Sequence, residues 1–121
     1  MPVLSDLDIN KAVAELQGLL VADESDSGYN YGYREKYPST IWVAKHEHGH
    51  QIEPWVQVNF VLTPDDAFPI ILDNRISIEP FNDETSWYSS VVDADNNQHK
   101  CFDANALKAA MICYLKMNNR I

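Results

Sequence analysis

Histidines recur at every second position near the middle of the chain, a spacing that metal sites can use. They are His46, His48 and His50 in the run His-Glu-His-Gly-His. On one strand they would share a face, because side chains alternate with a period of two, and three imidazoles on one face could bind zinc or another late transition metal. The alternative is an exposed polar hairpin tip, which Gly49 favours. A metal-dependent enzyme using this cluster is therefore one hypothesis.

A polar segment rich in tyrosine and basic residues precedes the histidines. Aromatic faces stack on nucleobases, and Arg and Lys pair with phosphates, so the segment predicts a lid over a nucleotide-like ligand. Tyrosine also favours contacts between proteins, and a loop that packs its rings on its own domain is the third interpretation. The candidate ligand-binding residues, including two tryptophans that would otherwise belong to the core or its rim, are Tyr29, Tyr31, Tyr33, Arg34, Lys36, Trp42 and Trp87.

Carboxylates between residues 65 and 73 are the third group that could do chemistry. Asp66 and Asp73 are seven residues apart, which places them on one face of a helix. Such a pair could do acid–base work only with perturbed pKa values. Asp65 and Asp66 are explained more simply as acids at the positive end of a helix dipole. The chain has no Gly-x-Ser-x-Gly, P-loop or Gly-x-Gly-x-x-Gly motif, and we predict no catalytic residue and no cofactor.

The elements that must position these residues follow from the hydrophobic pattern. A capping-box variant followed by apolar residues at helical spacing predicts a helix over about residues 6–18. Thr63 and Pro64 begin a second helix, which continues to residue 73 and is short or kinked at Pro69. Asn74 is expected to end this helix in the left-handed conformation.

Short alternating or apolar runs between the helices predict strands. They cover residues 40–44, 55–61, 75–79, 86–92 and 99–102. A last helix follows, capped by Asp103 or Asn105. The order helix, two strands, helix, three strands, helix predicts an α+β fold, because runs of neighbouring strands with short turns favour antiparallel pairing. We expect a sheet of about five strands with the three helices packed mainly on one face.

The composition describes one acidic domain. The chain has 121 residues and a formal net charge of −9, so we expect a single domain over residues 1–121. Direct binding to DNA or RNA is not expected, because neutralising phosphates needs clustered Lys and Arg. We expect neither a membrane span nor a secretory signal. Cys101 and Cys113 are expected to be reduced thiols that behave as small hydrophobic groups, as in a cytoplasm.

Three stretches of the chain carry a family resemblance. They cover residues 7–15, 63–78 and 105–112, and the middle one contains Asp66, Ala67, Pro69, Ile70, Ile71, Asn74, Ile76 and Ser77. In order and spacing they resemble the NinX family of phage proteins, a domain of unknown function typified by lambdoid phages. Phe68 stands where the family usually has Trp, and Asp73 where it usually has Glu, while Trp87 fits a later Trp. Residues 21–62 match little of the pattern.

The resemblance implies a phage or prophage origin and residence in the host cytoplasm, and it brings no known activity. Small phage accessory proteins often act against host factors. By that analogy, we expect a non-catalytic binding protein in counter-defence that sequesters a nucleotide-derived host signal. The alternative is an acidic protein that is steered to a basic surface of a host protein and inhibits it. Pairing of free sheet edges across a two-fold axis would give a homo-oligomer.

Overall fold

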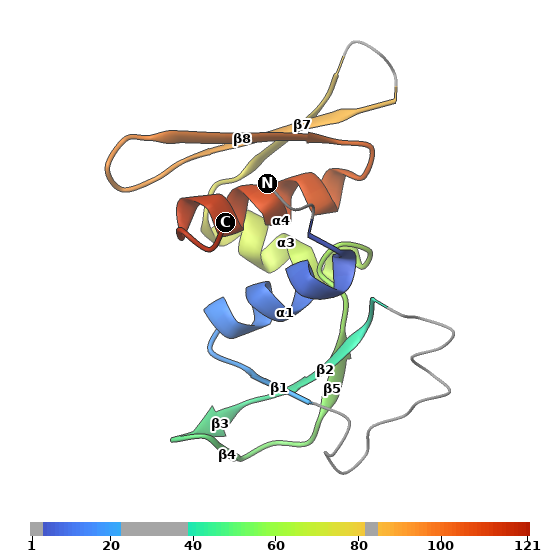
Figure 1. Cartoon of the computed structure of the whole chain (residues 1–121), viewed down its shortest axis with the longest axis vertical. Helices are drawn as coiled ribbons and strands as arrows, with labels where there is room; N and C mark the ends of the chain where they lie inside the picture. Colours follow the sequence, from blue (N-terminus) through green and yellow to red (C-terminus); the bar gives the residue numbers. More distant parts are fainter. Residues whose placement is uncertain (1–3, 23–38, 82–84) are drawn as a thin grey trace. The chain divides into compact units, whose positions relative to one another are not determined.

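The computed structural model describes residues 4–22, 39–81 and 85–121 (Figure 1). These residues form three helices and eight strands in three antiparallel sheets, which confirms the expected α+β class. They fall into two compact units that meet in the sequence between Asn59 and Phe60. The arrangement differs from the expected single sheet, because the strands on each side of this boundary pair only within their own unit.

The first helix, α1 (Asp6–Leu16), begins where the sequence predicts. The Ser5 hydroxyl accepts the backbone N–H of Asp8 at 3.1 Å, which satisfies a donor that the helix itself leaves unpaired. The helix ends before the predicted residue 18. The reason is Gly18, whose φ of +75° is a left-handed conformation that glycine adopts at little cost and that commonly ends helices.

An antiparallel sheet follows α1 in the first unit. It consists of β1 (Leu20–Val21), β2 (Ile41–Ala44) and β5 (Val56–Val58) in the order β1-β2-β5. The helix contacts β1 and β2. The buried apolar side chains of this unit include Ile9, Val13, Ala14, Ile41, Val43 and Ala44. Between β2 and β5 the chain forms a separate hairpin of β3 (His46–Glu47) and β4 (His50–Gln51).

Buried amide side chains hold this unit together. Asn10 is 0% and Asn59 is 3% exposed. The side-chain amide of Asn10 donates to the Ser39 carbonyl at 2.7 Å and to Asn59 Oδ1 at 3.0 Å. Asn59 Nδ2 donates in turn to Ser39 Oγ at 2.8 Å and Thr40 Oγ1 at 3.3 Å. Because buried polar groups are costly when unpaired, this network fixes α1 against the segments that flank β2 and β5.

The second unit opens with α3 (Pro64–Asp73), which begins at the predicted Thr63 cap and includes Pro69. The helix is short, as expected from the donor that Pro69 removes. The prediction of a left-handed Asn74 is wrong: its φ is −100°, and Arg75 is left-handed instead, at +54°. The Asn74 side chain donates to the Ile70 carbonyl at 2.8 Å, which holds Asn74 in the last turn, and the chain reverses at the next residue.

A three-stranded sheet and a long helix complete the second unit. The sheet has the order β6 (Ser77–Pro80), β7 (Trp87–Val92), β8 (Gln98–Asp103), and α4 (Ala106–Met117) contacts all three strands. In Figure 1, α4 lies along one side of β7 and β8. Asn105, one of the two predicted caps, accepts the backbone N–H groups of Leu107 and Lys108 at 2.9 and 3.1 Å. The buried apolar residues of this unit include Ile70, Ile71, Ile76, Val91, Met111 and Leu115.

Candidate ligand-binding site

The sheet β6-β7-β8 has two chemically different faces. Ser89 and Val91 of β7 are buried and belong to the face that α4 covers, where the Cys113 thiol of α4 donates to the Ser89 carbonyl at 3.3 Å. Side chains alternate along a strand, so Tyr88 lies on the opposite face. We call this face, which carries Tyr88, the outer face of the sheet.

Strand register places residues of β6, β7 and β8 side by side on the outer face. Glu79 pairs with Tyr88, and Tyr88 pairs with Phe102, so one residue from each strand forms a row across the sheet. Lys100 pairs with Ser90 and lies in the neighbouring row on the same face. The pairing of the three strands therefore fixes the Cα positions of these residues.

Aromatic rings make up the centre of this outer surface. The ring centroids of Phe81 and Phe102 are 4.9 Å apart in an edge-to-face arrangement with an interplanar angle of 77°. Tyr88 and Phe102 are also 4.9 Å apart, with their rings tilted by 44°. Both distances are within the range that aromatic pairs prefer. Phe81 is nevertheless 44% exposed and Phe102 51% exposed, and contiguous exposed apolar surface of this kind commonly marks a binding site.

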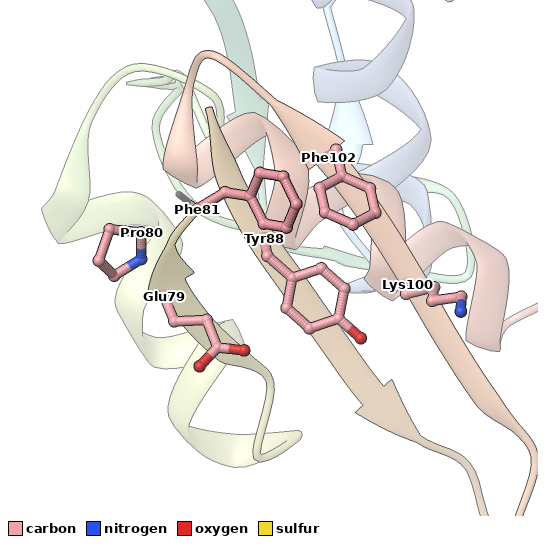
Figure 2. A pocket seen from close by; sticks show the side chains of 6 residues that line it. All are labelled: Glu79, Pro80, Phe81, Tyr88, Lys100 and Phe102. Atoms are coloured by element: carbon pink, nitrogen blue, oxygen red, sulfur yellow. The ribbon is translucent and has the colours of Figure 1, made fainter. Parts of the chain in front are cut away.

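A hollow of about 340 Å³ lies over these rings, lined by Glu79, Pro80, Phe81, Tyr88, Lys100 and Phe102. Its volume falls at the small end of the range for ligand pockets. Figure 2 shows Tyr88 between Glu79 and Lys100, with Phe81 and Phe102 side by side. A flat ring can stack on the aromatic side chains, while the lysine ammonium attracts an anionic group and the carboxylate accepts N–H donors.

Lys116 extends from α4, on the face opposite the hollow, and its ammonium donates to the backbone carbonyl of Lys100 at 2.8 Å. The cation that lines the hollow is Lys100. Glu79 and Lys100 are both exposed. The β8 side of the hollow is therefore basic and the β6 side acidic, a polarity that would orient a bound molecule carrying a negative charge at one end.

A known protein family matches most of the chain. A family model described as bacteriophage P22 NinX matches residues 2–118. The chain belongs to the NinX family. The comparisons of this NinX-family chain with curated proteins and with solved structures give no significant match.

The residues that carried the NinX resemblance are largely packing residues. Ile70, Ile71 and Ile76 are buried in the second unit, and Ala67 is 0% exposed. Phe68, which stands at the usual Trp position of the family pattern, is 46% exposed on α3. In this NinX-family chain, the motif residues therefore serve mainly to pack α3 into its unit. The rings around the hollow are not part of the motif.

The ligand site predicted for this NinX-family chain shares no described residue with the hollow. Tyr29, Tyr31, Tyr33, Arg34 and Lys36 lie outside the described residues. Trp42 is a half-buried residue of β2 in the first unit. Trp87 is on β7 and 38% exposed, but alternation places it on the other face from Tyr88.

The three histidines lie at a hairpin tip, the alternative that Gly49 favoured. His46 is on β3 and His50 on β4, while His48 and Gly49 form the turn with φ values of 53° and 84°. Glu47 pairs with His50 and His46 with Gln51, so His46 and His50 start on opposite faces of the hairpin. In the described part of the chain, no group of three or more His, Cys, Asp or Glu side chains could hold a metal ion.

The carboxylates of α3 and the two cysteines lie where the simpler interpretations place them, at the helix ends and as free thiols. Asp65 and Asp66 are in the first turn of α3, and Asp73 is its last residue. Cys101 is half-buried and Cys113 buried, both as free thiols. Desolvation raises the pKa of each thiol, which makes both weak nucleophiles. Across residues 4–22, 39–81 and 85–121, no helix is long and apolar enough to cross a membrane.

Tyr88, Phe102, Phe81 and Lys100 were missed as site residues. The strands over 86–92 and 99–102 were predicted, so a signal was present: Lys100 and Phe102 occupy alternate positions on one of them, and Tyr88 is on the other. Alternation within each strand does not give the register between strands, and this register decides whether the rings meet.

Proposed function

We propose that this phage-family protein is a non-catalytic binding protein that takes a nucleotide-like ligand into the hollow on the outer face of the β6-β7-β8 sheet. The observation that carries the proposal is the group of exposed, mutually packed rings of Phe81, Tyr88 and Phe102 with Lys100 beside them. Rings on a sheet face are a general way to hold bases, and stacking contributes roughly 1–3 kcal/mol per base.

Preorganisation supports this use of the surface. The rings extend from paired strands, and the other face of the same sheet is covered by α4. A ligand therefore meets side chains whose backbone positions are already fixed, which reduces the ordering cost of binding. The small volume of the hollow favours a mononucleotide or one unit of a larger nucleotide over a long nucleic acid. This agrees with the acidic charge of the chain, −9 in total, which disfavours a polyanion.

The biological role that we propose is sequestration of a nucleotide-derived host signal. Two points support it: the chain belongs to a phage family, and a hollow with two charged side chains and aromatic rings is equipped to bind and orient a ligand. Sequestration needs stoichiometric binding without turnover. Counter-defence in the host cytoplasm is the setting in which such binding would benefit a phage.

The test is a binding measurement with tag-free protein and two matched variants. Thermal shift against nucleoside monophosphates, cyclic dinucleotides and ADP-ribose selects a ligand, and calorimetry then gives its affinity. Phe102→Ala removes a ring that lines the hollow. Val92→Ala removes a similarly exposed side chain of the same outer face that does not line the hollow. We expect Phe102→Ala to weaken binding at least tenfold and Val92→Ala to leave it unchanged. Absence of binding by every nucleotide, or equal binding by both variants, contradicts the proposal.

A second candidate function, inhibition of a host protein, is favoured by the surface of α3. Phe68 and Leu72 are one turn apart on this helix, 46% and 74% exposed, with the exposed carboxylate of Asp65 on the same side. An apolar pair beside an acid fits a basic amphipathic helix of a partner. Capture of such a partner by the wild type and not by Leu72→Asp, with an association rate that falls with salt, would support this function. Equal capture by both proteins would exclude this surface.

A further inference from the structure

We infer that the hollow prefers guanine nucleotides, with Glu79 recognising the edge of the base and Lys100 its phosphate. The inference deepens the proposed function and rests on it, because it concerns the same hollow. It goes further by assigning a ligand class to the two charged residues, which stacking on the aromatic rings leaves undefined.

The row of paired residues places Glu79 at the edge of any ring that stacks at the centre. Glu79, Tyr88 and Phe102 belong to β6, β7 and β8 and are paired in register. Neighbouring strands are about 4.8 Å apart, so the backbones of Glu79 and Phe102 are separated by roughly 10 Å. A base stacked on Tyr88 and Phe102 fills this interval, and its edge points along the row toward the Glu79 carboxylate (Figure 2).

The chemistry of a carboxylate selects among the bases. An ionised Glu has two oxygens that accept and no group that donates. Guanine presents two adjacent donors on one edge, its N1–H and its 2-amino group, which match these oxygens as a bidentate pair. Adenine and cytosine present an amino group beside a ring nitrogen that repels the second oxygen. Uracil presents a single N–H between two carbonyls. Guanine is therefore the base that a single carboxylate satisfies best.

The opposite charge on β8 fixes the direction of the ligand. Lys100 lines the hollow from the strand farthest from Glu79. With the base edge toward β6, the phosphate extends toward the Lys100 ammonium. In the reversed orientation the phosphate would approach the Glu79 carboxylate, and like charges would oppose binding.

Calorimetry with GMP, IMP and AMP tests the inference. IMP lacks only the 2-amino group of GMP, so this pair isolates the second hydrogen bond. We expect wild-type protein to bind GMP about tenfold more tightly than IMP or AMP. Glu79→Gln replaces one acceptor by a donor and should abolish this preference, while Asp95→Asn, the same change of charge in the turn at the far end of the β7–β8 hairpin, should retain it. Lys100→Gln should reduce the advantage of GMP over guanosine. Glu79 is exposed, and circular dichroism checks that its variant is folded.

The outcomes separate the two proposals. If GMP, IMP and AMP bind equally and Glu79→Gln changes nothing, the guanine assignment is overturned while nucleotide binding in the hollow stands. A preference for AMP that depends on Glu79 overturns the guanine assignment in the same way. If none of the three nucleotides binds, the guanine assignment fails, and the proposed function fails with it only when cyclic dinucleotides and ADP-ribose do not bind either. A GMP preference lost in Glu79→Gln and kept in Asp95→Asn supports both.

Discussion

The side chains of Asn10 and Asn59, far apart in the sequence, hydrogen-bond to each other inside the first unit, with 3.0 Å between Asn10 Nδ2 and Asn59 Oδ1. Asn10 comes from the middle of α1 and Asn59 from the end of the unit, just after β5. This pair therefore links the helix to the sheet through buried polar contacts as well as through apolar packing.

Replacing Asn10 by alanine should lower the free energy of unfolding by about 1–3 kcal/mol. The change removes the hydrogen bonds from the Asn10 side chain to Asn59 Oδ1 and to the Ser39 carbonyl, and the loss of buried hydrogen bonds has a cost of this size. Urea denaturation measures the change. Gln57→Ala, which removes an exposed amide on β5, is the control and should alter the free energy of unfolding by less than about 0.5 kcal/mol. Equal midpoints for the two variants would contradict the structural role of the pair.

The cap of α4 gives a second prediction about stability. Asn105→Ala removes the acceptor of two backbone N–H groups and the donor to the Val61 carbonyl at 2.6 Å. We expect it to lower the free energy of unfolding by about 1–2 kcal/mol. Asn105→Asp keeps the acceptor but loses the donor, so its effect should be smaller. If thermal unfolding shows the two variants to be equally damaging, the bond to Val61 matters more than the cap.

Acid should destabilise the protein partly through Asp93. A hydrogen bond from His99, 2.8 Å away, and one from the Asn97 backbone N–H lower the pKa of the Asp93 carboxyl below its ordinary value. Because the folded pKa is depressed, this contribution is fully present above the unfolded value and is lost as pH falls through the folded one. Urea midpoints between pH 7 and pH 2 should therefore fall less steeply for Asp93→Asn than for wild type. Asp95→Asn, in the same turn, should follow the wild-type curve more closely than Asp93→Asn does.

The two thiols should react slowly and in a fixed order. Desolvation raises the pKa of Cys101 and of Cys113, and reaction with iodoacetamide requires the thiolate. Cys113 is 0% exposed, whereas Cys101 is half-buried, so mass spectrometry at pH 8 should show Cys101 modified first. In urea both should react quickly. Equal native rates for the two thiols would indicate local opening of α4.

Element types were predictable because they depend on local patterns. The cap at Ser5, the Thr63–Pro64 start and the alternation around Tyr88 are properties of neighbouring residues, and α1, α3 and β7 lie where those patterns predict. The division into three sheets depends on which strands pair across longer stretches of chain. The pattern of each strand is compatible with several partners, so it favoured one sheet where three form.

The candidate site was less predictable for the same reason. The histidine run is compatible with one strand or with a hairpin tip, and the turn at His48 and Gly49 separates its members. The rings of Phe81 and Phe102 are 21 residues apart in the numbering and meet only through the register of β6, β7 and β8. A site formed by rows across a sheet leaves no compact motif in the sequence.

The two outer strands of the β6-β7-β8 sheet carry residues that discourage further strand addition. Pro80 has no N–H to offer to an incoming strand, and Lys100 places a charge on β8; both devices limit edge-to-edge aggregation. A surface with exposed aromatic rings would otherwise favour association between copies of the chain. The charge of Lys100 thus also limits edge-to-edge pairing. Substitutions at this position should remain polar, so that solubility is preserved while binding is measured.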